Sequence, residues 1–225
     1  MSETFKPLSI YTLLATLLDY PEPELLDAIK EIDQELEAFP EAVQGALRPL
    51  LALLSEHPLI ELQENYVATF DRNPAHSLHL FEHVHGESRD RGQAMVDLLD
   101  EYRRLGLEMV TNELPDHVPL FLEVLGNIDP AQARALLDEA IHVLAALGDR
   151  LARDESPYEG VFTVLRSLTD VVPLAAETPP IRDMDEALER FGPGADGVEP
   201  LLAPSMPTPL AQPMHFHPRL PVTAN

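Results

Sequence analysis

Apolar residues, most of them leucine, recur at helical spacing along most of this chain, and this period constrains the fold more than any other feature. Apolar residues three and four positions apart lie on one face of an α-helix. Stripes of this kind run through residues 10–18, 25–36, 43–54 and 59–70. Residues with high β-propensity are sparse, and strand signals are nearly absent. The sequence therefore predicts an all-α fold.

The second half of the chain shows clearer helix boundaries. Ser88 is placed to cap a helix that ends near Gly106, and Pro115 suits the first position of the next helix. Asp129-Pro130 then opens a long stripe made of Leu136, Ala140, Leu144, Leu147 and Leu151. With short connections between elements, residues 1–172 are predicted to form a single bundle of about eight helices.

The composition changes after residue 172. Residues 173–225 hold 11 of the 22 prolines. A segment so rich in proline cannot build a packed core, so we expect a mobile tail with one short helix at residues 183–191.

Charge and composition exclude several classes of function. The chain has 39 acidic and 15 basic residues, a formal net charge of −24, which argues against binding nucleic acid or anionic membranes. It has no cysteine, no apolar run long enough to span a bilayer and no secretory signal at Met1–Pro7, so we expect a cytoplasmic protein that is not inserted in a membrane. Residues 7–71 contain 13 acidic and two basic residues. This field either steers a cationic peptide or only keeps a helical scaffold soluble.

A histidine-rich segment contains a pattern typical of an enzyme. His79, Glu82 and His83 form an H-x-x-E-H motif, which on a helix could place two imidazoles on zinc beside a general base. Glu123 or His117 could supply the third ligand. The alternative is that these histidines form hydrogen bonds where a helix meets a loop. Elemental analysis of protein purified without added metal separates the two.

Two marked segments combine polar and apolar residues and suggest a groove for a peptide. They are residues 76–92, which hold four of the nine histidines, and residues 113–123, in which Asp116 and His117 follow Pro115. The predicted apolar groove comprises Phe70, Leu80, Phe81 and Phe121. The predicted polar rim comprises His83, His85, Glu87, Arg89, Asp90, Asp97, Asp116 and His117.

The same segments resemble one known family. Phe70-Asp71-Arg72, the run from Leu80 to Leu98 and the run from Glu113 to Glu123 are similar to the NarJ family of assembly chaperones for respiratory nitrate reductase. Leu17 to Pro21 and Ala152 to Tyr158 also fit, so the resemblance covers roughly residues 8–172.

The resemblance implies a non-catalytic protein of the cytoplasm without a cofactor of its own. It implies that the partner is the apo form of the molybdenum-containing catalytic subunit, bound through its N-terminal peptide. Members of this family keep that subunit competent for insertion of the molybdenum cofactor and iron–sulfur clusters before it docks on the membrane. Proteins that make the molybdenum cofactor are further expected partners.

Overall fold

The structure is a computed structural model that describes residues 9–85 and 89–173, apart from the side chains of His85 and Arg89. Nine α-helices and no β-strand occur in these residues, which confirms the all-α fold. The helices are α1 (Ile10–Leu18), α2 (Pro23–Leu36), α3 (Glu41–Glu56), α4 (Leu59–Tyr66), α5 (Leu80–His85), α6 (Arg89–Arg104), α7 (Val118–Asn127), α8 (Pro130–Arg153) and α9 (Glu159–Ser167). A π-helical turn (Val67–Asp71) follows α4, and a 3₁₀ turn (Pro74–His76) precedes α5.

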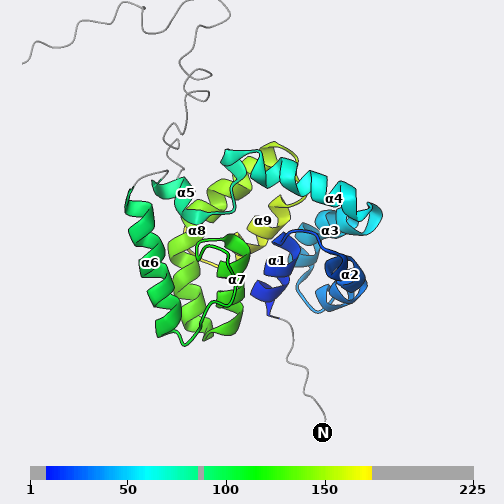
Figure 1. Cartoon of the computed structure of the whole chain (residues 1–225). Helices are drawn as coiled ribbons and strands as arrows, with labels where there is room; N and C mark the ends of the chain where they lie inside the picture. The colour runs from blue at the N-terminus through cyan, green and yellow to red at the C-terminus, as the bar shows by residue number, and fades with distance from the viewer. Residues whose placement is uncertain (1–8, 86–88, 174–225) are drawn as a thin grey trace, which may run out of the picture. The chain divides into compact units, whose positions relative to one another are not determined.

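The core forms where α1, α3, α7, α8 and α9 meet. α1 packs on α7, while α9 packs on both α8 and α3 (Figure 1). Gly126 of α7 lies so close to α1 that an added Cβ atom would be 2.5 Å from Thr12 Oγ1. The predicted stripes lie inward: Leu25, Ile29, Ile32 and Leu36 of α2, for example, are all buried.

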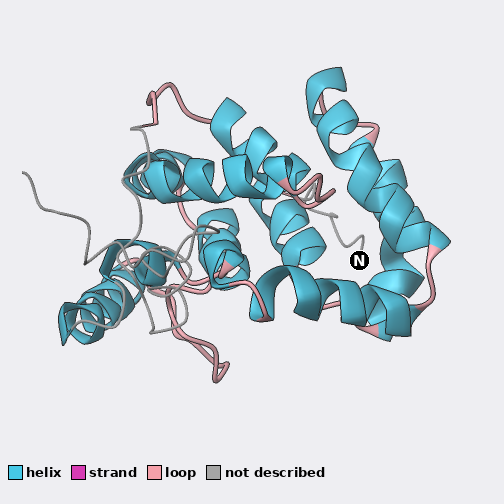
Figure 2. Cartoon of the chain, turned by 90° about the horizontal axis from the view of Figure 1, so that it is seen from above, coloured by secondary structure: helices cyan, strands magenta, loops and turns pink. Residues whose placement is uncertain are grey.

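α2 and α3 form a helical hairpin, and every element described along the chain is a helix or a loop (Figure 2). The α8 helix begins as predicted, because the Asp129 side chain accepts a hydrogen bond of 2.9 Å from the Ala131 N–H. The longest helix, α8, carries several charged residues, and no described helix combines the length and apolar character that a membrane span requires.

The predicted helix start at Pro115 is wrong, because α7 begins three residues later at Val118. The residues before it pair with another part of the chain instead. Leu80 N–H donates to Asp116 O at 3.0 Å, and Val118 N–H donates to Leu78 O at 2.8 Å. These two bonds hold His117 in an extended conformation, which no helix can contain.

Some predictions fall on residues that the structure does not describe. Ser88, the proline-rich tail from residue 174 and its short helix at 183–191 lie outside the described residues. The described residues all belong to one compact unit of the chain, while the domain boundary near residue 172 stays a prediction.

Candidate functional site

A two-bond contact between distant segments brings two histidines together. The backbone bonds just described join residues 78–80 to residues 116–118 as an isolated antiparallel bridge between His79 and His117. The two imidazole rings consequently lie 5.3 Å apart, centroid to centroid, and are tilted by 38°. They border a pocket of about 310 Å³, here named the histidine pocket, lined by Tyr66, Phe70, Asp71, Pro74, Ser77, Leu78, His79, Glu82 and His117.

Asp116 is the buried centre of this arrangement. Its side chain has no exposed surface. Oδ1 lies 3.1 Å from His79 Nδ1, and Oδ2 accepts a hydrogen bond of 3.0 Å from the Phe81 N–H. Phe81 is in the first turn of α5, where backbone N–H groups lack partners within the helix. Asp116 therefore caps α5 from a segment 35 residues away.

The shared environment shifts the pKa values of the two histidines in opposite directions. The hydrogen bond with Asp116 raises the pKa of His79 above its ordinary value, although burial acts against this. Burial lowers the pKa of His117, and the neighbouring charge of His79 adds to that effect. As pH falls, His79 is the first of the pair to become cationic, and it does so against the Asp116 carboxylate.

The zinc interpretation of the H-x-x-E-H motif is wrong on geometry. α5 begins at Leu80, so His79 precedes the helix and cannot share a helical face with His83. His83 Nε2 donates to Ser77 O at 2.8 Å, and its Nδ1 accepts from Arg150 at 3.1 Å, since a guanidinium can only donate. Both ring nitrogens of His83 are thus engaged. No group of three or more potential metal ligands converges among the described residues.

The second hollow is a groove between α6 and α8, here named the α6–α8 groove. Its volume is about 520 Å³, and it is lined by Phe81, Ala94, Asp97, Leu98, Glu101, Arg104, Leu105, Gln132, Ala135, Leu136 and Glu139. The large apolar side chains among them are half-buried and partly pack on the core. Asp97 and Glu139 are exposed beside them. The groove therefore offers apolar surface edged by carboxylates.

The cations near the groove are engaged by acidic or polar groups. Arg104 pairs with Glu101 at 2.8 Å, and Arg91 pairs with Glu82 at 3.1 Å. On the rim itself, Gln93 donates to Asp97 at 2.8 Å. The combination of apolar surface with an acidic rim suits an amphipathic segment that carries positive charge.

The structure divides the predicted groove residues between separate places. Phe81 and Asp97 line the α6–α8 groove, whereas Phe70 and His117 border the histidine pocket. Asp116 is buried and structural. His83 is half-buried and accepts a hydrogen bond from Arg150.

Of the remaining predicted residues that the structure describes, Leu80, Phe121 and Asp90 line neither hollow. Leu80 and Phe121 are buried in the core, with 6% and 2% of their surfaces exposed, so both are closed to a peptide in this conformation. Phe70 is also largely core, since its ring packs against Tyr66 and Tyr158 with centroid distances of 4.8 and 4.9 Å. Asp90 is exposed at the start of α6. The side chains of His85, Glu87 and Arg89 lie outside the described residues.

Sequence reasoning missed the α8 side of the groove. Leu136 belongs to the stripe predicted for the core, yet it is half-buried and faces the groove with Ala135 and Glu139. The fully buried row of α8 runs through Leu137 and Ile141 before it reaches Leu144, Leu147 and Leu151, which are buried as predicted. The two rows differ by one position, and both are apolar, so helical period alone could not separate them.

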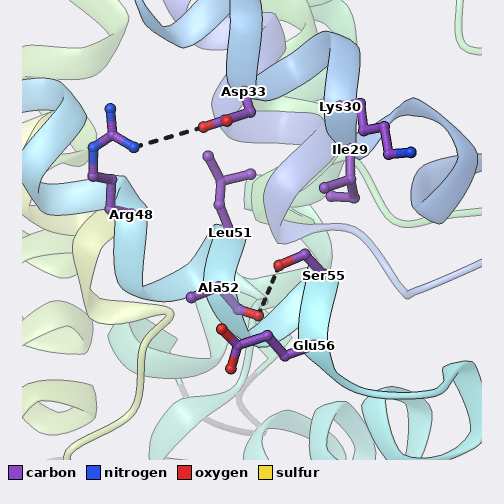
Figure 3. Close-up of a pocket in the computed structure, with 8 residues that line it drawn as sticks. All are labelled: Ile29, Lys30, Asp33, Arg48, Leu51, Ala52, Ser55 and Glu56. Carbon is purple, nitrogen blue, oxygen red and sulfur yellow. Dashed lines mark hydrogen bonds and ion pairs between the residues drawn. The ribbon is translucent and has the colours of Figure 1, made fainter.

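A third hollow lies between α2 and α3, away from both marked segments. It has a volume of about 380 Å³, and its lining includes Lys30 and Arg48, the two basic residues of the acidic N-terminal part (Figure 3). Arg48 lies 3.8 Å from Asp33, while Glu56 lines the opposite end. Because positive and negative groups balance here, this pocket is a poorer match to a cationic segment than the α6–α8 groove.

Comparison with known proteins gives a consistent family. Residues 36–164 match the model of the nitrate reductase delta subunit family. The chain is 41% identical over 161 residues to the nitrate reductase molybdenum cofactor assembly chaperone NarJ of Escherichia coli (strain K12), covering 70% of this chain and 68% of that protein. It is equally identical over 161 residues to a protein of the same strain named probable nitrate reductase molybdenum cofactor assembly chaperone NarW, covering 72% and 68%. A probable assembly chaperone NarJ of Bacillus subtilis (strain 168) is 27% identical over 158 residues, covering 69% and 85%.

Proposed function

Because the chain belongs to the nitrate reductase delta subunit family, we propose that it is a system-specific chaperone for the assembly of a nitrate reductase. Like its relatives, it is a non-catalytic protein. Its partner is the apo form of the molybdenum-containing catalytic subunit, which it binds in the cytoplasm through that subunit's N-terminal segment. Binding keeps the subunit open to the molybdenum cofactor and iron–sulfur clusters, and delays docking on the membrane. Proteins that make the molybdenum cofactor are further partners.

The observation that carries the peptide-binding part of this proposal is the α6–α8 groove. An amphipathic helix can lay its apolar face on Phe81, Leu98 and Leu136 while its cations face Asp97 and Glu139. Each large side chain buried in the groove contributes about 1.5–3 kcal/mol. Ordering a flexible segment costs about 2–5 kcal/mol. Modest affinity results, which suits a chaperone that must release its client.

Filling the groove should block the segment. Ala135 lines the groove and is exposed, so an Ala135→Trp side chain can occupy the groove without entering the core. We expect the dissociation constant for a synthetic N-terminal peptide of the catalytic subunit to rise at least about tenfold, because one anchoring side chain loses its place. Titration calorimetry at fixed pH and salt measures this.

The matched control is Ala152→Trp, which changes another exposed alanine of α8 that does not line the groove. This variant should bind the peptide as the unmodified protein does. Equal affinity of both variants would show that the peptide binds elsewhere. An unmodified protein that takes up no peptide would contradict the proposed function itself.

A further inference from the structure

The charges of the α6–α8 groove differ between its two ends. One end lies beside α5, which contributes Phe81 to the lining. This end also faces the C-terminal half of α8, because His83 of α5 bonds to Arg150 near the end of α8. The N-terminal half of α8 therefore lies toward the far end of the groove, and α6 and α8 run in opposite directions along it.

Two carboxylates of the rim, those of Asp97 and Glu139, have no basic partner among the described residues, and both lie toward the α5 end. Asp97 is seven residues before Arg104 on α6, and Glu139 is seven residues after Gln132 on α8. In antiparallel helices these positions face each other at the α5 end. The far end holds Arg104 and Gln132, and the Glu101 carboxylate near it is neutralised by Arg104 at 2.8 Å.

These charges favour one direction of a bound helix over the other, because a helix is itself polar. A helix carries roughly half a positive charge at its N-terminus and half a negative charge at its C-terminus. The dipoles of α6 and α8 oppose each other because the two helices are antiparallel. The charged side chains of the rim therefore determine which direction of a bound helix is favoured. In a segment from the start of a protein, the α-ammonium group adds a full positive charge at the same end as the positive pole.

We propose that the groove fixes the direction of its ligand, with the ligand's N-terminus at Asp97 and Glu139 and its C-terminal end at Arg104. The bound helix then runs parallel to α6. The α6 residues that line the groove, Ala94 to Leu105, span about 16 Å, which accommodates about three helical turns. This inference rests on the proposed function, since it takes the N-terminal segment of the catalytic subunit as the ligand.

The absence of cysteine from the chain allows a direct test by disulfide coupling. Ala94→Cys places one thiol at the α5 end, and Gln132→Cys places one at the far end. The probes are synthetic N-terminal peptides of the catalytic subunit with a cysteine at the amino end or about three turns further on. Each peptide cysteine is supplied as a mixed disulfide with a small thiol, which leaves when the thiolate of the protein attacks. We expect the amino-end peptide to couple several-fold faster to Ala94→Cys, and the other peptide to couple several-fold faster to Gln132→Cys.

Acetylating the peptide's amino group provides a second readout. Because acetylation removes one positive charge, it should weaken binding to the unmodified protein about two- to fivefold, as expected for the loss of an exposed ion pair. The loss should vanish in the double variant Asp97→Asn, Glu139→Gln and persist in Arg104→Gln. Equal or reversed coupling rates, with binding intact, would overturn the direction and leave the proposed function standing. Peptides that neither bind nor couple would overturn both.

Discussion

Replacing Asp116 with alanine should lower the free energy of unfolding by about 3 kcal/mol. The substitution removes the acceptor for the Phe81 N–H and the partner of His79 from a site with no exposed surface. Buried polar groups that lose their partners cost far more than surface contacts. Urea denaturation followed by circular dichroism at pH 7 measures the loss. Asp100→Ala, which breaks only an exposed pair with Arg103, should change the stability by less than about 0.5 kcal/mol.

The Asp116→Asn variant tests the electrostatic part of the same contact. The raised pKa of His79 means that protonated His79 stabilises the folded state. This contribution is complete below the ordinary pKa of histidine and is lost as pH rises through the pKa of His79 in the folded protein. Because asparagine carries no charge, the destabilisation caused by Asp116→Asn should be larger at pH 6 than at pH 8. A loss of stability that does not depend on pH would show that the charge of Asp116 does not contribute to the contact.

A second large loss of stability is expected from a substitution at the contact between α9 and α3. Gly160 of α9 lies against the backbone of α3, and an added Cβ atom would be 2.0 Å from Ala46 O. Backbone cannot move aside as a flexible side chain can, so Gly160→Ala should lower the free energy of unfolding by about 2–3 kcal/mol. Thermal and urea denaturation at neutral pH give the value.

Gly45 provides the control on the other helix of that contact. It lies within α3, is exposed, and would have no atom within 4 Å of an added Cβ. Gly45→Ala should therefore raise the stability by about 0.5–1 kcal/mol, because alanine favours a helix. If Gly160→Ala were as stable as Gly45→Ala, α9 could not approach α3 this closely.

The helices could be predicted because their signal is local. The α2 stripe needed only the spacing of Leu25, Ile29, Ile32 and Leu36, and all four are buried. The start of α8 could be predicted for the same reason, since Asp129 caps the helix that follows it directly.

The site was harder to predict than the helices, because its contacts join segments that are far apart in the sequence. Asp116 caps α5 across 35 residues, and the bridge that holds His117 extended pairs it with His79. Neither partner is encoded in the local spacing, so the sequence suggested a helix at Pro115 and a metal motif at His79. The two marked segments do meet, through a buried carboxylate and beside the histidine pocket, but residues 113–123 do not line the α6–α8 groove.

The functional prediction depended on side chains whose burial the sequence could not give. Phe81 and Phe121 are both aromatic and both lie near polar residues, yet only Phe81 reaches the α6–α8 groove. That the predicted residues bind a peptide stays a prediction. Of the predicted residues, Phe81 and Asp97 line the α6–α8 groove, together with Leu98 and Leu136, which were not predicted as site residues.

Co-purification from cells tests the central claim most directly. The tagged chain is expressed with the apo catalytic subunit of nitrate reductase, either complete or without its N-terminal segment, and the recovered subunit is quantified. We expect the complete subunit to be retained and the shortened subunit to be lost. We also expect Ala135→Trp, but not Ala152→Trp, to release the complete subunit. Equal recovery of the complete and shortened subunits, or recovery of neither, would contradict the proposed function.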